Sequence, residues 1–243
     1  MFRGCSIAVV VPAFDEAGKI AATIRSVPAF VDHVIVVDDG SRDDTAAIAR
    51  AAIPPAGEVI AHAHNRGVGA AIATGYARAL ALGADATAVM AGDGQMHPDD
   101  LPALLAPVVD GAADYAKGNR FAWPGAWRAM PPVRVAGSVA LSLLTRLASG
   151  YWHVFDSQCG YTVVSRQTLV ALGPERLFAR YGYPNDLLAR LGAIGARVVD
   201  VPVRPVYGPE WRSGLRPARV ALPIAGLLLR GWLRRMRAEA RAS

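Results

Sequence analysis

Two short runs of β-branched residues, each ending in acidic residues at a turn, constrain the fold of this chain more than any other feature. The first run, residues 9–16, has the sequence VVVPAFDE, and the second, residues 34–41, has the sequence VIVVDDGS. Each is too short to cross a membrane and is typical of a buried strand that turns into a helix. In open α/β sheets, ligands bind outside the carboxyl ends of the strands. The two runs therefore predict one ligand site formed by two strand ends.

Strands and helices are expected to alternate along the chain. The hydrophobic pattern predicts strands near 7–12, 33–38, 57–62, 86–91, 113–118 and 197–203. It predicts helices near 16–27, 43–53, 67–82, 99–109, 133–149 and 184–195. This alternation is typical of repeated βαβ units, so the sequence predicts an α/β fold with a mostly parallel sheet and helices on both faces.

Basic residues are concentrated at the C-terminal end of the 243-residue chain. The net charge is +6, with 53% apolar and 19% charged residues, enough apolar residues for a large core. Residues 211–243 contain eight arginines and one acidic residue, Glu239, whereas residues 1–210 contain 18 basic and 19 acidic side chains. The chain is therefore divided into a domain, 1–210, and a basic tail, 211–243.

The tail combines its arginines with an apolar run at residues 220–229 and with Trp232. Ten residues are well short of the ~20 that span a bilayer. A helix lying in the membrane interface, with arginines on its polar side, is therefore expected. An ordinary helix packed on the domain is the alternative. Nucleic-acid binding is not expected, because no basic surface with interleaved aromatic residues occurs elsewhere.

The N-terminal segment and the cysteines bear on location. The apolar stretch at 7–14 runs directly into Asp15 and lacks a small-residue cleavage site, so it is predicted to be a strand and not a signal peptide. Cys5 and Cys159 are far apart and have no metal-ligand spacing, which favours a reducing compartment. The prediction is a cytoplasmic protein, peripheral at the inner face of the membrane.

Six segments occur in order across the first 170 residues. They are VVVPAFDEAGKI (9–20), VIVVDDGSRDDT (34–45), NRGVGAAIATGYARAL (65–80), VMAGDGQMHPDDL (89–101), AKGNRF (116–121) and FDSQCGYTVVSR (155–166). Through them the chain resembles the family 2 glycosyltransferases, and within that family the branch of dolichyl-phosphate mannosyltransferase. The resemblance implies a GT-A-type fold. It also implies inverting transfer of a hexose from a UDP- or GDP-sugar to a dolichyl or undecaprenyl phosphate.

The resemblance also implies residues for the nucleotide. Pro12, Phe14 and Glu16 would line the pocket for base and ribose, and Asp38 or Asp39 would contact the base. A carboxylate accepts a hydrogen bond from a ring N–H, and an aromatic ring offers an apolar face to a base. Helix capping is the alternative, and one residue can do both; the candidates for it are Asp15, Asp39, Ser41 and Asp43.

A cation must balance the charge that the nucleoside diphosphate gains as it leaves. Asp93 and Gln95 follow the predicted strand at 86–91 and are expected to ligate Mg²⁺ or Mn²⁺, which prefer oxygen ligands. The family usually has Asp-x-Asp here, but this chain has Ala91 at the first position. One metal-ligating carboxylate is therefore missing. A plain turn before a helix is the alternative explanation of Asp93.

The segment from Asn65 to Gly69 opens a predicted helix. Free N–H groups at a helix start, together with Arg66 and Gly67, would favour an anion. Close packing of the helix against the sheet explains the two glycines equally well.

Three residues are candidates for the reacting centre. The resemblance implies that Arg120 and Arg134 contact donor or acceptor phosphates, which a guanidinium binds with two parallel hydrogen bonds. Asp156 would be the base for a sugar hydroxyl, with Asp186 as the rival, or would organise metal or acceptor if the acceptor is a phosphate. Solvent-exposed arginines and a buried turn carboxylate are the alternatives.

Polyprenyl phosphate is the favoured acceptor. One alternative is a glycosyltransferase that extends a glycan or a lipid-linked oligosaccharide. Another is a nucleotide-sugar-binding protein with little catalysis, because the metal motif is incomplete at Ala91.

Overall fold

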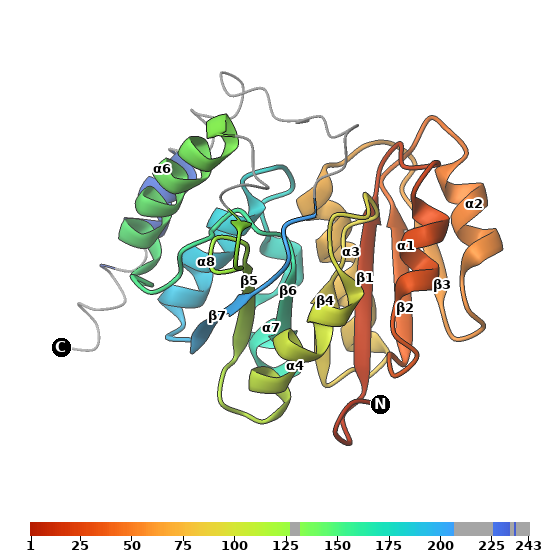
Figure 1. Cartoon of the computed structure of the whole chain (residues 1–243), viewed down its shortest axis with the longest axis horizontal. Coiled ribbons are helices and arrows are strands. Elements are labelled where there is room, and N and C mark those ends of the chain that lie inside the picture. The colour runs from red at the N-terminus through yellow and green to blue at the C-terminus, as the bar shows by residue number, and fades with distance from the viewer. Residues whose placement is uncertain (127–131, 207–225, 234–235, 237–243) are drawn as a thin grey trace.

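One seven-stranded sheet organises the described part of the molecule (Figure 1). The computed structural model describes residues 1–126, 132–206, 226–233 and 236, without the side chains of residues 132–134 and 136. The strands are β1 (Ile7–Ala13), β2 (His33–Asp38), β3 (Glu58–Ala61), β4 (Ala86–Val89), β5 (Tyr115–Asn119), β6 (Thr162–Ser165) and β7 (Val198–Pro202). Their order across the sheet is β3-β2-β1-β4-β6-β5-β7.

Helices cover both faces of this sheet, as predicted. They are α1 (Ile20–Ser26), α2 (Thr45–Ala52), α3 (Val68–Ala81), α4 (Leu101–Val109), α6 (Pro132–Ser149), α7 (Arg166–Leu172) and α8 (Tyr183–Ala193), with short 3-10 helices η1 (Pro98–Asp100) and η2 (Pro174–Arg176). Apolar residues of α1, α2 and α4 pack with Val9 and Val11 of β1, while those of α3, α7 and α8 share the other core with Val10. The alternation along β1 explains this, because successive side chains point to opposite faces of the sheet.

The carboxyl ends of β1 and β2 lie side by side. The two strands are parallel, and Ala13 is in register with Asp38. Strand β4 pairs with the other side of β1, also in parallel, so the residues after β4 reach the same edge of the sheet. The predicted meeting of the first two strand ends is therefore confirmed.

One strand departs from the parallel arrangement. Strand β6 lies between β4 and β5 and is antiparallel to both, and α7 follows it directly. Neither β6 nor α7 was predicted from the sequence, because each is short, although Ser165 and Gly173 cap the two ends of α7. The later elements α6, α8 and β7 occur where they were predicted, and the expected α/β fold class is confirmed.

The described part of the tail is helical and packs on the domain. Residues 226–233 run beside α6 (Figure 1), and Leu228 contacts the buried Ala148. A Cβ built on Gly231 would lie 2.6 Å from the Cβ of Ala189 in α8, so this helix approaches the domain closely. No helix in the described ranges is long and apolar enough to cross a bilayer. The division at residue 210 stays a prediction, because most of the tail lies outside those ranges.

Candidate active site

A cavity of about 430 Å³ lies at the carboxyl edge of the sheet, where β1 and β4 end and α3 begins. Its size is in the range of small-molecule sites. Six residues predicted from the sequence line it: Pro12, Phe14, Glu16, Asp39, Gly67 and Asp93. Two lining residues that the sequence analysis did not predict, Arg180 and Tyr181, come from the segment between η2 and α8.

The remaining predicted residues lie away from this cavity or outside the described part. Asp38, Arg66, Gln95, Arg120 and Asp156 are not among the residues that line it. Arg134 is in the first turn of α6, and its side chain is outside the described part.

Asp39 is held at the cavity wall by backbone groups. Its carboxylate accepts hydrogen bonds from the N–H of Arg66 (3.0 Å) and of Gly67 (2.7 Å), and it contacts His62 Nδ1 at 2.7 Å. The anion at the start of α3 in this structure is therefore a carboxylate of the chain itself. His62 was assigned no role from the sequence, because its partner is 23 residues away and no spacing connects the two.

Asp38 closes the turn after β2. Its carboxylate accepts hydrogen bonds from the hydroxyl and the backbone N–H of Ser41. Gly40 in this turn has φ +72°, and a Cβ there would lie 2.6 Å from the backbone of His64. Asp38 therefore holds a turn and does not cap a helix, because α2 begins at Thr45, and of the two aspartates it is Asp39 that lines the cavity.

Two carboxylates, Glu16 and Asp93, form the acidic end of the cavity. Burial raises the pKa of Glu16, and the negative charge of Asp93 raises it further. A divalent cation between them would relieve this repulsion, so the site fits a hard metal ion. Asp93 also accepts a hydrogen bond from the backbone N–H of Gln95 (3.0 Å), and Ala91 lines the cavity without offering a ligand. Among the described residues, no three His, Cys, Asp or Glu side chains are grouped as a metal site. Phosphate or water oxygens would have to complete the shell.

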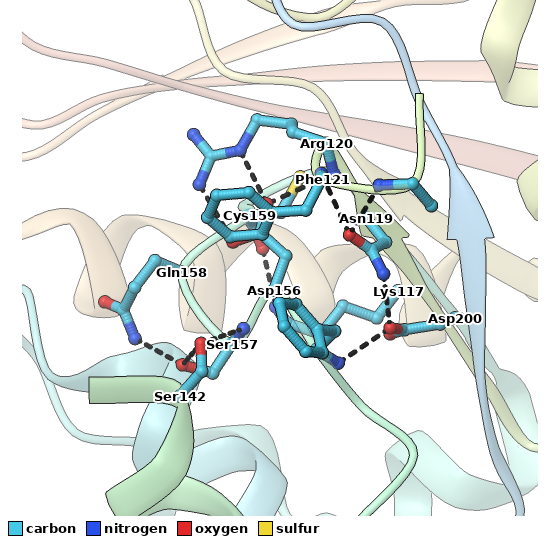
Figure 2. A network of polar contacts seen from close by, with 12 residues as sticks. Lys117, Asn119, Arg120, Phe121, Ser142, Asp156, Ser157, Gln158, Cys159 and Asp200 are labelled. Carbon is cyan, nitrogen blue, oxygen red and sulfur yellow. Dashed lines mark hydrogen bonds and ion pairs between the residues drawn. The ribbon is translucent and has the colours of Figure 1, made fainter. Parts of the chain in front are cut away.

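Arg120 and Asp156 form a buried ion pair (Figure 2). Arg120 Nε is 2.7 Å from Asp156 Oδ2, and Nη2 is 2.9 Å from Oδ1. Burial raises the pKa of Asp156, but the charge and hydrogen bonds of Arg120 outweigh it and hold that pKa below its usual range. A carboxylate with a low pKa and both oxygens engaged is a poor general base.

A second buried network supports this pair (Figure 2). The fully buried Lys117 donates a hydrogen bond from Nζ to the carbonyl oxygen of Cys159 (2.6 Å). Asp200 of β7 accepts hydrogen bonds from Asn119 Nδ2 (2.8 Å) and from the backbone N–H of Phe155 (2.7 Å). Burial lowers the pKa of Lys117 and raises that of Asp200. The network ties β5 and β7 to the loop that carries Asp156, and the sequence analysis missed it because Lys117 and Asp200 stand in ordinary strand patterns.

The rival base, Asp186, has a structural environment. Its carboxylate accepts hydrogen bonds from the backbone N–H of Phe178 (3.1 Å) and from Arg190 Nε (2.7 Å), and it does not line the cavity. Asp186 therefore anchors the segment before α8, which brings Arg180 and Tyr181 to the cavity.

Comparison with known families decides the class of the protein. The family model described as "Glycosyl transferase family 2" matches residues 8–173, more than half of the chain. The chain belongs to glycosyl transferase family 2. It is a glycosyltransferase, and the resemblance noted in its sequence is confirmed.

Relatives and solved structures of this glycosyltransferase agree on the class. A UDP-N-acetylglucosamine–dolichyl-phosphate N-acetylglucosaminyltransferase of Methanococcus voltae is 30% identical, with 83% of this chain and 86% of the relative covered. An undecaprenyl-phosphate mannosyltransferase of Micrococcus luteus is 31% identical, with 81% and 82% covered. Among solved structures, glucosyl-3-phosphoglycerate synthase of Mycobacterium tuberculosis with Mn²⁺, UDP-glucose and phosphoglyceric acid has a TM-score of 0.69 at 25% identity, covering 94% of this chain and 80% of that chain.

Proposed function

We propose that this glycosyltransferase moves a hexose, with inversion, from a nucleoside-diphosphate sugar to a polyprenyl phosphate. The observation that carries the proposal is the Arg120–Asp156 pair, which leaves Asp156 with a depressed pKa and little basicity. A sugar hydroxyl needs a base to become a nucleophile, whereas a phosphate oxygen is already anionic at neutral pH. The names of the archaeal and bacterial relatives, both of which act on polyprenyl phosphates, support this acceptor.

The cavity is the proposed site for the donor. Phe14 and Pro12 would face the base, and Asp39 would accept a hydrogen bond from it at the position where backbone groups hold its carboxylate. A cavity of about 430 Å³ has room for much of a nucleotide sugar. The complex of the M. tuberculosis synthase with UDP-glucose supports a nucleoside-diphosphate sugar as the class of donor.

A divalent cation, Mg²⁺ or Mn²⁺, is proposed to bind beside Asp93. Asp93 and Glu16 supply the carboxylates, and the Mn²⁺ in the M. tuberculosis synthase supports this choice of metal. When bound, the cation would neutralise charge on the departing diphosphate. Gln95 contributes a backbone hydrogen bond to Asp93, and a role for its side chain as a ligand stays a prediction.

Arg120 and Arg134 are proposed to lie toward the phosphate of the acceptor. Arg120 follows β5, and Arg134 begins α6, so both belong to the half of the sheet beyond β4. Asp156 would orient Arg120 through the two hydrogen bonds between them. Asp156 is thus proposed as a positioning residue for the phosphate-binding arginine.

The acceptor would be reached at a membrane surface on the cytoplasmic side. Leu143 and Leu144 of α6 are about half exposed, and Leu229, Trp232 and Leu233 of the neighbouring helix are exposed as well. Exposed leucines and tryptophan beside arginines are typical of helices that lie in a membrane interface. Replacing Leu144 and Trp232 by Gln should reduce co-sedimentation with anionic vesicles. Unchanged sedimentation would contradict this surface.

The proposed function is tested with a panel of UDP- and GDP-sugars and a short-chain polyprenyl phosphate. The expected result is release of nucleoside diphosphate that requires both the lipid phosphate and Mg²⁺ or Mn²⁺, and that EDTA abolishes. Release that is indifferent to the lipid phosphate but needs a glycan would favour the glycan-extending enzyme. Donor binding without turnover on any acceptor would favour a nucleotide-sugar-binding protein.

A further inference from the structure

A single cationic side chain, that of Arg180, lines the cavity among the described residues, which also place the carboxylates of Glu16, Asp39 and Asp93 there. Arg180 lies outside residues 8–173, the part of the chain that matches the family model. We infer that Arg180 binds the diphosphate of the donor. This inference rests on the proposed function, because it assumes that the donor occupies this cavity.

The backbone around Arg180 is built into the cavity wall. The carbonyl oxygen of Ala179 accepts a hydrogen bond from the N–H of Ala70 in the first turn of α3 (3.0 Å). A Cβ on Gly69 would lie 2.0 Å from the carbonyl oxygen of Phe178, and one on Gly67 would lie 2.4 Å from that of Ala179. Only residues without a Cβ allow this approach, so the two glycines bring Arg180 to the start of α3.

This packing explains why Gly67 and Gly69 occur at the start of α3. They serve close approach, but the partner is the segment before α8 and not the sheet. The N–H groups of Gly67 and Ala70 are engaged by Asp39 and by Ala179. A phosphate at this end of the cavity therefore cannot use these two N–H groups, and Arg180 is placed to donate hydrogen bonds beside them.

The side chain of Arg180 has the geometry for this task. Its Nη1 is 3.3 Å from Oδ1 of Asn65, which also lines the cavity. A hydrogen bond of this length to a neutral amide is weaker than the charge-assisted pair of bonds that a guanidinium makes with a phosphate. Arg180 is solvent-exposed, so its charge is accessible to a ligand.

The charge balance of the cavity also favours a phosphate-binding role for Arg180. A diphosphate brings further negative charge to a site that already contains three carboxylates. Ala91 offers no ligand where the resemblance implies an Asp, so the cation site is smaller by one carboxylate. An arginine in the wall of the cavity would supply part of the positive charge that the diphosphate requires.

Binding of UDP, UMP and uridine, and of the guanosine series, tests this role in the presence of Mg²⁺. Relative to the wild type, Arg180→Gln should weaken binding of the diphosphate by about 10- to 100-fold, the size expected for a lost charge-assisted contact. Binding of the monophosphate should fall less, and binding of the nucleoside should not change. Arg180→Lys should restore part of the loss, because it keeps the charge but not the paired hydrogen bonds.

Arg176→Gln is the matched control, because Arg176 is exposed, pairs with Glu175 and does not line the cavity. It should bind all three ligands like the wild type. If Arg180→Gln weakens binding of all three ligands equally, or weakens none, the inference about Arg180 is overturned. The proposed function is not affected by that result. If the wild type binds neither UDP nor GDP, the proposed donor fails, and the inference fails with it.

Discussion

Asp39 in one half of the sheet and Asp156 in the other are held in different ways. At the ends of β1 and β2, the carboxylates of Asp38 and Asp39 accept hydrogen bonds from backbone N–H groups. Beyond β4, the charges of Arg120 and Asp156 are buried against each other. The first half keeps three carboxylates on the wall of a cavity, whereas the second half neutralises the carboxylate of Asp156 inside the protein.

This difference means that the carboxylates of the two halves can do different chemistry. Backbone hydrogen bonds hold an anion in place without cancelling its charge, so the first half can still attract a metal ion or a base N–H. A bidentate ion pair cancels charge and fixes geometry, so the second half holds the guanidinium of Arg120 in one orientation. The first half is thus suited to cations, and the proposed function places the phosphate of the acceptor in the second half.

Breaking the buried pair of Arg120 and Asp156 should have the largest effect on the free energy of unfolding. Asp156→Asn leaves the buried guanidinium of Arg120 without its counter-charge, which typically costs about 3–5 kcal/mol of unfolding free energy. Urea unfolding measures this loss. As a control, Arg120→Met combined with Asp156→Leu removes both charges and should recover much of the stability. A loss under ~1 kcal/mol in the single variant would show that the pair is not an effective contact.

The corresponding change in the first half is Asp39→Asn. It should lower the free energy of unfolding less than Asp156→Asn does, and it should lower the affinity for a nucleoside diphosphate more. In the wild type, the two carboxylate oxygens of Asp39 accept hydrogen bonds from the N–H groups of Arg66 and Gly67. In Asp39→Asn, one oxygen remains an acceptor, but the new NH₂ group faces the other N–H, which loses its acceptor. A buried donor without an acceptor costs about 1–3 kcal/mol. Nucleoside diphosphate binding, followed by calorimetry, should fall at the same time. A stability loss larger than that of Asp156→Asn would reverse the comparison.

The smallest effect is a change in the pH dependence of stability. Because burial raises the pKa of Asp200, the folded state holds this proton more tightly than the unfolded state. Stability therefore falls as pH rises from the ordinary carboxyl range, about 4, toward the folded pKa. Asp200→Asn removes this fall, so its urea midpoint relative to wild type should be higher at pH 7 than at pH 4.

Asp114→Asn is the control with the opposite sign. The hydrogen bonds of Arg197 hold the pKa of Asp114 below its usual range, so its contribution is present above about pH 4 and is lost in acid. This variant should lose more stability at pH 7 than at pH 4. If both variants shift in the same direction, the assignment of Asp200 as a destabilising buried carboxyl is wrong.

The parts of the site that depend on local pattern were predictable from the sequence. Strand ends at Ala13 and Asp38 follow from β-branched runs and turn residues, so the placement of Phe14, Asp39 and Asp93 at one edge could be anticipated. Partners that are distant in the sequence could not. Arg180 meets Asn65 across 115 residues, and no periodicity records such a contact.

The buried network around Lys117 and the antiparallel strand β6 could not be predicted from the sequence, for related reasons. Lys117 is an ordinary polar residue in a strand until the fold shows it to be fully buried against the carbonyl of Cys159. Strand β6 has four residues, too few for an alternating pattern to be distinctive. Both depend on tertiary packing, which a single sequence does not display.

The central claim is that the acceptor supplies its own anionic nucleophile. The most direct test compares a polyprenyl phosphate with the polyprenol of the same chain length, using the donor that supports turnover. The account predicts glycosyl transfer to the phosphate and none to the alcohol, because Asp156, paired with Arg120, is a poor base for a hydroxyl. Transfer to the alcohol or to a glycan hydroxyl at a comparable rate would contradict it.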